Sequence, residues 1–245
     1  EELKLQIETQ ISKSDYPDVF QQFKHINEEL YIEGIQQIFK EAEKQQNNEI
    51  YFKLSPFIMK GIPIITTNID KGLEIALRIP EHKISIIPLG KYNLNSSILY
   101  LHGRIDEPDS WILSESEYAK KYANSQEFLN FWEDFFKKYK IIIFLGYSLE
   151  ERDVQRKFYK RNISLFWTYR VCRKEEEEIV KISKVIDKME RNNTKIYPIT
   201  YLCDYSCKDE KSNKNSCKNE KSIINLLDYI YNMAFGIGLD SYREE

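Results

Sequence analysis

Two short polar motifs stand where apolar runs end, and their residue types suit proton-transfer chemistry. The first is Thr66 to Asp70 (TTNID), directly after the apolar residues 62–65, and the second is the pair His102-Gly103, directly after residues 98–101. An asparagine amide can orient a water molecule without adding a charge, and an imidazole can accept a proton near neutral pH. In open α/β sheets, ligands bind at the ends of the strands, so this pairing predicts a site at one sheet edge.

A third polar motif follows the apolar run 141–145 and consists of Gly146, Tyr147 and Ser148. A continuous apolar run without alternation is typical of a strand buried on both faces, as in a parallel sheet. If the three strands are parallel neighbours, all three motifs face one crevice. The third motif also precedes a predicted helix, whose first N–H groups suit a phosphate or ribose oxygen.

Each motif taken alone also has a purely structural explanation. Asn68 and Asp70 favour turns because their side chains bond to their own backbone. His102 could be a satisfied histidine at a strand end, and Ser148 with Glu151 forms a capping box that would only start a helix. The ordered combination of the three motifs favours a functional site, and the position at strand ends predicts that neither Asn68 nor His102 packs in the core.

Hydrophobic patterning predicts strands and helices that alternate along most of the chain, which indicates an α/β fold with a mostly parallel sheet. A capping box of Ser114 with Glu117 starts one of these helices, and the aromatic spacing over 125–139 predicts a helix that faces the core. The predicted strands are 62–66, 84–88, 98–101, 141–145, 165–171 and 196–202, and the predicted helices are 16–46, 50–60, 71–77, 114–123, 125–139, 149–160, 175–191 and 223–235.

Composition excludes several classes of protein. The chain has 245 residues and a net charge of −3, so it lacks the basic surface that direct nucleic-acid binding requires. No apolar run approaches the roughly 18–20 residues of a membrane span. The cysteines contain no CxxC pair, which argues against a metal site and for free thiols in a reducing cytoplasm; they are Cys172, Cys203, Cys207 and Cys217.

In order along the chain, Ile64 to Asp70, Tyr100 to Gly103 and Phe144 to Leu149 resemble the core motifs of sirtuin-like domains. The match is closest to the prokaryotic sirtuin-like branch found in antiviral defence proteins, where the histidine motif precedes a P-x-x-x-(V/I)-L-(S/T)-x-x-x-Y stretch. Pro108 to Tyr118 fits that stretch, and the resemblance covers residues 50–170. It implies a Rossmann-like NAD-binding domain with helices on both faces of a mostly parallel sheet.

The resemblance also implies roles for individual residues. Asn68 would position water or substrate at the ribose carbon that bears nicotinamide, and His102 would be the general base for a ribose hydroxyl. Asp70 would contact the nicotinamide side of the pocket.

The remaining residues of the implied NAD site belong to the same motifs. Thr66 and Thr67 would contribute to binding the dinucleotide, and Gly146 and Ser148 would hold its adenosine ribose or phosphates. No metal is implied.

The implied activity is an NAD⁺ glycohydrolase that releases nicotinamide and depletes NAD⁺ as the effector of an antiphage defence system. Such domains resemble modules of larger homo-oligomeric proteins with further domains or sensor subunits. Deacetylating sirtuins carry a four-cysteine zinc module after the histidine motif, and no cysteine lies between His102 and Cys172, so peptide deacylation is disfavoured. The alternative is a catalytically silent module that binds NAD or ADP-ribose or mediates assembly.

One family motif is absent, a Gly-Ala-Gly-x-Ser loop that in relatives lies upstream of the TTN motif. We therefore expect this chain to be a fragment whose sheet lacks its first strand, and the absence also supports the silent alternative. The predicted organisation is one domain over residues 1–245, with a helical segment at 1–50, an α/β core at 51–202, a charged loop at 203–221 and a closing helix and tail at 222–245.

Overall fold

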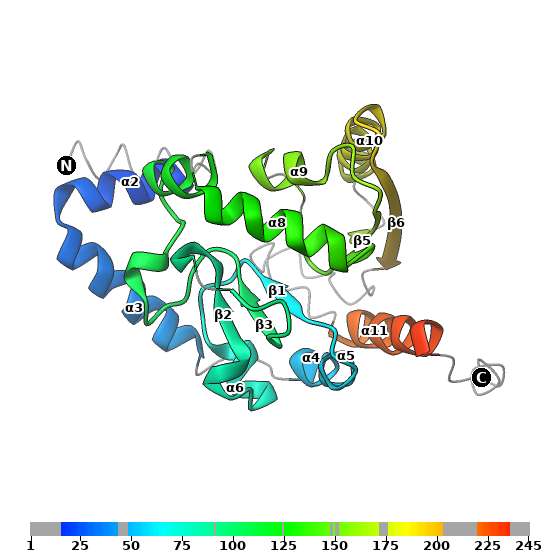
Figure 1. Ribbon diagram of the computed structural model, residues 1–245, viewed down its shortest axis with the longest axis horizontal. Helices are drawn as coiled ribbons and strands as arrows, with labels where there is room; N and C mark the ends of the chain where they lie inside the picture. The colour runs from blue at the N-terminus through cyan, green and yellow to red at the C-terminus, as the bar shows by residue number, and fades with distance from the viewer. Residues whose placement is uncertain are drawn as a thin grey trace, which may run out of the picture. The chain divides into compact units, whose positions relative to one another are not determined.

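The computed structural model of the chain describes residues 16–43, 49–90, 92–123, 125–147, 149, 152–171, 176–202 and 220–235. The chain divides into two compact units, residues 1–131 and 132–245. Each unit contains its own parallel sheet with helices (Figure 1), and each is described by itself.

The sheet of the first unit consists of β1 (Ile64–Thr66), β2 (Ile84–Ile86) and β3 (Ile98–Tyr100), in the order β1-β3-β2. Both strand pairs are parallel, and Thr66 of β1 is in register with Tyr100 of β3. β3 is the central strand, and all of its residues are buried. Because the strands are parallel, their carboxyl ends lie at one edge of this sheet.

The helices of the first unit are α2 (Tyr16–Ile26), α3 (Glu28–Glu43), α4 (Glu49–Phe52), α5 (Ser55–Met59), α6 (Gly72–Leu77) and α7 (Glu115–Tyr118), with the short helices η1 (Glu81–Lys83), η2 (Ile87–Leu89), η3 (Pro108–Ser110) and η4 (Ala119–Ala123). The prediction of one continuous helix over 16–46 is wrong, because the chain breaks at Asn27. The Asn27 Oδ1 accepts a hydrogen bond from the Leu30 N–H at 3.0 Å and so caps the start of α3. The predicted helix over 50–60 is likewise divided, into α4 and α5.

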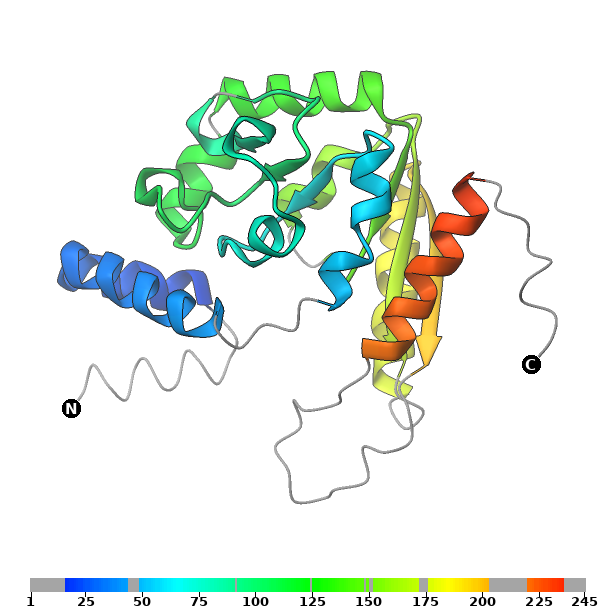
Figure 2. The same ribbon diagram turned by 90° about the horizontal axis from the view of Figure 1, so that it is seen from below.

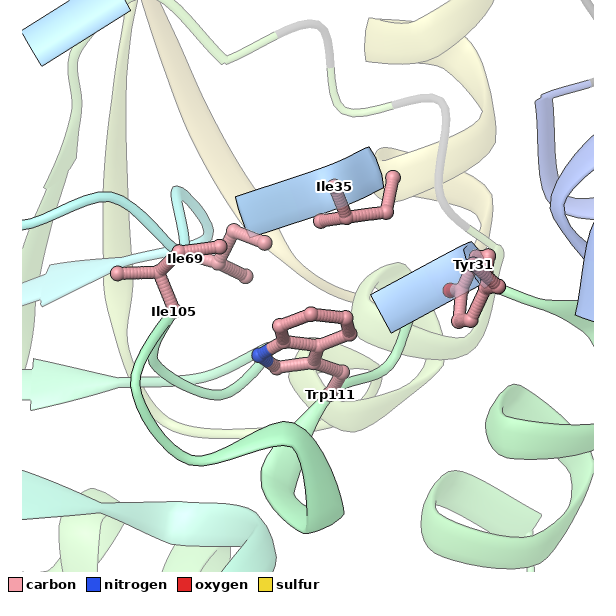
Figure 3. Close-up of a cluster of buried hydrophobic side chains, with 5 residues drawn as sticks. All are labelled: Tyr31, Ile35, Ile69, Ile105 and Trp111. Carbon is pink, nitrogen blue, oxygen red and sulfur yellow. The ribbon is translucent and has the colours of Figure 1, made fainter. Parts of the chain in front are cut away.

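Two apolar clusters hold the first unit together. In one, Leu73 of α6 packs with Ile98 and Tyr100 of β3, so α6 covers the sheet. The other joins α3 to the loops that follow β1 and β3 (Figure 3); its buried members are Tyr31, Ile35, Ile69, Ile105 and Trp111. The α2–α3 hairpin therefore packs on the loops that carry the polar motifs.

The start of α7 confirms the capping box predicted at Ser114 and Glu117. Glu117 Oε2 accepts hydrogen bonds from the backbone N–H groups of Leu113 and Ser114, each at 2.9 Å. Its other oxygen, Oε1, lies 3.0 Å from the Lys24 Nζ on α2. Burial opposes ionisation, but these hydrogen bonds and the Lys24 charge together lower the pKa of Glu117.

The sheet of the second unit has the order β4-β5-β6, formed by β4 (Ile141–Phe144), β5 (Ser164–Val171) and β6 (Lys195–Leu202). Both pairs are parallel. The helices α10 (Glu176–Arg191) and α11 (Glu220–Phe235) both contact β6 and flank it on opposite sides (Figure 2). α9 (Arg152–Phe158) connects β4 to β5. Parallel strands with helices on both faces confirm the predicted Rossmann-like α/β class.

The helix α8 (Gln126–Lys138) confirms the predicted aromatic core helix, since all of its patterned aromatic side chains are buried; they are Phe128, Phe131, Trp132, Phe135 and Phe136. In the first unit Phe128 packs on Tyr122, and in the second unit Trp132 and Phe136 contact Phe158 of α9. The spacing of the aromatic residues was sufficient to predict this buried face, because a helix places residues i, i+3, i+4 and i+7 on one side.

Two expectations about the sheet are corrected. The described strands form two three-stranded sheets rather than one. In addition, β4 is not buried on both faces: Ile141 is 64% and Ile143 is 37% exposed. Ile141 and Ile143 lie on the same face, since alternate side chains of a strand point to opposite faces, and among the described strands β4 is an edge strand that pairs with β5.

Some predicted features fall outside the described residues: all four cysteines, and the charged loop apart from Glu220 and Lys221, which begin α11. None of the helices described here combines the length and the apolar character that a membrane span requires.

We predict that Gly103→Ala destabilises the fold strongly. Gly103 has a φ of +92°, and an added Cβ would lie 2.4 Å from the Ser110 carbonyl oxygen. The expected loss is roughly 2–5 kcal/mol of unfolding free energy, combining left-handed backbone strain with overpacking against backbone. Urea unfolding measures this loss of unfolding free energy.

The matched control is Gly61→Ala, where φ is +75° but no atom lies within 4 Å of the added Cβ. Only the backbone strain of roughly 1–2 kcal/mol therefore remains in this variant. Equal losses in the two variants would contradict the close approach of Gly103 to Ser110.

We also predict that Glu117→Gln removes part of the acid sensitivity of the fold. The folded-state pKa of Glu117 lies below the usual 4.5, so the unfolded state binds the proton more readily. The stabilisation from the ionised carboxylate is therefore present above pH 4.5 and is lost as pH falls through the folded-state pKa. Unfolding free energies measured across this acidic range should fall more steeply for the parent than for Glu117→Gln. Glu115→Gln, an exposed change in the same helical turn, should retain the parent's slope.

Candidate active site

The first two polar motifs lie at the same edge of the β1-β3-β2 sheet, as the sequence predicted. Asn68 follows the end of β1 and His102 follows the end of β3, and these strands are parallel neighbours. Backbone hydrogen bonds continue past the strand ends: Leu101 N–H donates to Thr66 O at 2.8 Å, and Ile105 N–H donates to Ile69 O at 2.7 Å. The two loops are therefore fixed against each other through their backbones.

The TTNID loop is a turn stabilised by its own polar side chains. Thr66 Oγ1 accepts a hydrogen bond from the Asn68 N–H at 3.1 Å, and Asp70 Oδ1 accepts one from the Gly72 N–H at 2.8 Å, where α6 starts. The structural explanation thus holds for Asp70, and Thr66 makes a turn contact that the sequence analysis did not predict. Asn68 is the exposed residue of the motif, while Thr67 is half-buried and Asp70 is buried.

Ile69 is the apolar residue between the two polar ones, and it anchors the loop. Its side chain is 2% exposed and lies in the buried cluster that also contains Ile35 and Tyr31 of α3 and Trp111 (Figure 3). The Tyr31 and Trp111 rings meet edge to face, with their centroids 6.1 Å apart. The burial of Ile69 explains how Asn68 can be exposed on a loop whose backbone is fixed.

His102 is buried, contrary to the expectation that it would not pack in the core. It is 5% exposed, and its ring meets those of Tyr118 and Tyr122 edge-on, with centroid distances of 5.6 Å and 5.8 Å. The cause is that the chain folds back after the strand: the Ile112 N–H donates to His102 O at 3.0 Å. Asn68 and His102 therefore share a sheet edge but differ in their exposure.

Sequence reasoning gave Tyr118 no role at the site and missed Tyr122. The two tyrosines stack at 5.5 Å and form the wall against which the histidine ring lies. Their spacing of i and i+4 was the available signal, since it places both rings on one face of a helix. The contact of these tyrosines with His102 could not be predicted from the sequence, because it joins residues of different elements.

Charged and hydroxyl groups buried beside the loops were also missed. The Tyr100 hydroxyl donates towards Asp70 O at 3.0 Å and Glu74 Oε2 at 3.1 Å. Burial first, and then the negative charge of Glu74, raise the pKa of Tyr100, so the hydroxyl keeps its proton. Burial opposes the charge of Arg104, but hydrogen bonds to Glu74 and Glu81 outweigh it and raise the pKa of Arg104.

The third motif belongs to the second unit. Gly146 follows β4 in the left-handed region, with a φ of +63°, which glycine adopts without strain. Side chains of β5 hold this turn: Thr168 Oγ1 donates to Phe144 O and Trp167 Nε1 donates to Tyr147 O, each at 2.7 Å. Ser148 and its predicted capping partner Glu151 lie outside the described residues. That this motif shares a crevice with the other two stays a prediction.

The described part of the chain contains no group of three or more His, Cys, Asp or Glu side chains arranged to hold a metal ion.

Comparison with known proteins gives one family match. Residues 63–166 match the model of the SIR2-like domain, while the search of curated proteins finds no match. The matched range starts just before β1 and ends within β5, so it contains all three polar motifs. The α/β architecture and the matched range together support a sirtuin-like domain, an NAD-related module, over residues 63–166 of this chain.

Proposed function

We propose that this chain carries an NAD⁺ glycohydrolase site, with Asn68 and His102 as its catalytic residues. The supporting observation is that these residues follow the ends of the adjacent parallel strands β1 and β3. The reaction takes NAD⁺ and water to nicotinamide, ADP-ribose and a proton. Water adds to the ribose carbon as the bond to nicotinamide breaks, and nicotinamide leaves as a neutral molecule.

The chemistry of the two side chains fits these steps. The exposed Asn68 amide donates and accepts hydrogen bonds, so it can orient the attacking water without placing a charge beside the positive ribose centre. The His102 imidazole accepts a proton from a ribose hydroxyl and so stabilises the developing positive charge. Since His102 is 5% exposed and lies against Tyr118 and Tyr122, those rings fix the direction in which it meets the substrate.

The remaining proposed contacts follow the same motifs. Thr66 and Thr67 would contribute to binding the dinucleotide, and Asp70 would contact the nicotinamide side of the pocket. The Asp70 carboxylate keeps the TTNID turn closed by accepting the Gly72 N–H. Gly146 and Ser148 would hold the adenosine ribose or the phosphates. Gly146 adopts the left-handed φ of +63° that a tight turn after a strand requires.

The biological role that we propose is NAD⁺ depletion as the effector of an antiphage defence system in the cytoplasm. The proposed protein is a homo-oligomer with further domains or sensor subunits. Support comes from the ordered motifs, including Pro108 to Tyr118, that resemble the defence-protein branch.

A second candidate function is a catalytically silent module that binds NAD or ADP-ribose or mediates assembly. It is favoured by the hydrogen bonds of Thr66 and Asp70, whose side chains serve the turn itself, and by the burial of His102. Nicotinamide release from NAD⁺ by the full-length protein separates the two candidates. Binding of NAD⁺ without nicotinamide release would favour the silent module.

We predict that Asn68→Ala and His102→Gln each reduce nicotinamide release by roughly 10²- to 10⁴-fold, the usual effect of losing a positioned catalytic group. Glutamine fills much of the space of the buried ring, so the fold should persist, which a thermal melt checks. His82→Gln is the matched control, because His82 is exposed in η1. A His102→Gln protein with more than half of the parent's activity would remove His102 from its proposed role.

Ser148 gives a prediction that separates binding from capping. As a helix cap alone, Ser148→Ala should cost roughly 0.5–2 kcal/mol of stability and little affinity. As a ligand of NAD⁺, Ser148→Ala should weaken binding by more than its effect on melting explains. Calorimetric titration with NAD⁺ beside a thermal melt measures both quantities. Unchanged affinity with a lower melting temperature would leave only the cap.

A further inference from the structure

A buried ion pair joins α6, the helix that follows the Asn68 loop, to the loop that carries His102. Glu74 lies in the first turn of α6, the helix that follows the Asn68 loop, and Arg104 lies in the loop that begins at His102. The Arg104 Nη2 donates to Glu74 Oε1 at 2.6 Å, and the two side chains are 4% and 6% exposed. The pair therefore connects the two elements at a point shielded from water.

Arg104 is held by its two terminal nitrogens and by its backbone, while its Nε lies 3.4 Å from Asp106 Oδ1. Its Nη1 donates to Glu81 Oε1 at 2.6 Å and its Nη2 to Glu81 Oε2 at 2.9 Å, a two-point contact that sets the plane of the guanidinium. Its backbone N–H donates to Ser110 Oγ at 2.9 Å, and its carbonyl accepts from Trp111 Nε1 at 2.8 Å. A shift of the side chain would therefore move the loop that contains His102.

Glu74 is linked to the other loop in the same way. Its Oε2 accepts from the Tyr100 hydroxyl at 3.1 Å, and that hydroxyl lies 3.0 Å from Asp70 O. Tyr100 is the last residue of β3 and Asp70 ends the TTNID motif. The Glu74 carboxylate thus contacts Arg104 of the histidine loop directly, and it reaches Asp70 of the asparagine loop through the Tyr100 hydroxyl.

Net stability is a weak explanation for this arrangement. Burying both charges costs hydration that their attraction only about repays, and apolar replacements of such pairs are often as stable. A charge-assisted hydrogen bond between fixed groups does, however, define distance and direction. Such a fixed distance and direction matter where two loops must present their side chains to one reacting atom. Misplacement of a catalytic group by about 1 Å can lower the rate roughly 10²-fold.

We infer that Glu74 and Arg104 are positioning residues that set the placement of His102 relative to Asn68. The effect on rate rests on the proposed NAD⁺ glycohydrolase function, whereas the effect on the placement of His102 does not. Neither residue touches substrate in this scheme, so their loss should lower kcat and leave KM almost unchanged.

The test uses the full-length protein and its Glu74→Gln variant, which keeps the size of the side chain and an acceptor for the Tyr100 hydroxyl but loses the charge. Glu133→Gln is the matched control, because it makes the same chemical change at an exposed position. It breaks an ion pair of similar length, since Glu133 Oε1 lies 2.7 Å from Arg161 Nη2. Two quantities are measured: kcat and KM for nicotinamide release from NAD⁺, and the ¹³C signal of the His102 ring. The chain has three histidines, and the His102 signal is assigned by its loss in His102→Gln.

The expected result for Glu74→Gln is a fall in kcat of roughly 10²-fold, a KM within a few-fold of the parent, and a shifted His102 signal. Glu133→Gln should change none of these. A folded Glu74→Gln protein with the parent's kcat and an unmoved His102 signal would overturn the inference, and a lower melting temperature alone would show an ordinary structural pair.

The two proposals fail separately. If the parent releases no nicotinamide, the glycohydrolase proposal fails, and the His102 signal alone then decides whether the pair positions the histidine. Should Glu74→Gln not fold, Arg104→Lys takes its place, because lysine keeps the charge but cannot bridge Glu74 and Glu81 with one planar group. A moved His102 signal in that variant supports the inference, and an unmoved one overturns it.

Discussion

The parallel pairing of β1 with β3 is the constraint on which the first unit depends. It places Thr66 beside Tyr100 and so brings both polar motifs to one edge of the sheet. The pairing then extends into the loops, where backbone hydrogen bonds from Leu101 and Ile105 reach Thr66 and Ile69. An antiparallel arrangement would have put the ends of the two strands at opposite edges, and Asn68 and His102 could not have belonged to one site.

The burial of Ile69 is the second constraint on the first unit. Its contribution to the free energy of folding is larger than that of the exposed ion pairs nearby. Full burial of an isoleucine side chain contributes about 1.5–3 kcal/mol. An exposed pair such as Lys71 with Asp106, at 3.0 Å, contributes about 0–1 kcal/mol. The apolar contact with α3 therefore holds the turn, with Asn68 exposed on one side of Ile69 and Asp70 closing the turn on the other.

This arrangement gives the α2–α3 hairpin a direct connection to the site. Tyr31 and Ile35 of α3 contact the loop cluster, the Gln36 Nε2 donates to Ile105 O at 3.3 Å, and Lys24 of α2 pairs with Glu117. Glu117 caps α7, the helix that provides Tyr118 against His102. The helices α2 and α3 thus support both the loop that contains Ile69 and the helix that carries Tyr118.

The sequence by itself determined the features that depend on neighbouring residues. Apolar runs ending in polar motifs located the strands, the Ser114–Glu117 box located the start of α7, and aromatic spacing identified the buried face of α8, because each depends on residues a few positions apart. Parallel strands in alternation with helices followed from the same local patterns, whereas the shared edge of Asn68 and His102 was predicted only on the condition that their strands are parallel neighbours, which the pairing of β1 with β3 meets.

Only the tertiary structure decided the contacts between distant segments. It placed His102 against the tyrosines of α7 and η4, joined Glu74 to Arg104, divided the described strands between two sheets, and left Ile141 and Ile143 of β4 exposed. No local pattern encodes these outcomes, since the burial of a side chain depends on which surfaces meet it and not on its own neighbours in the chain. The residues suited to the chemistry could be read from the sequence, but the groups that hold them in place could not.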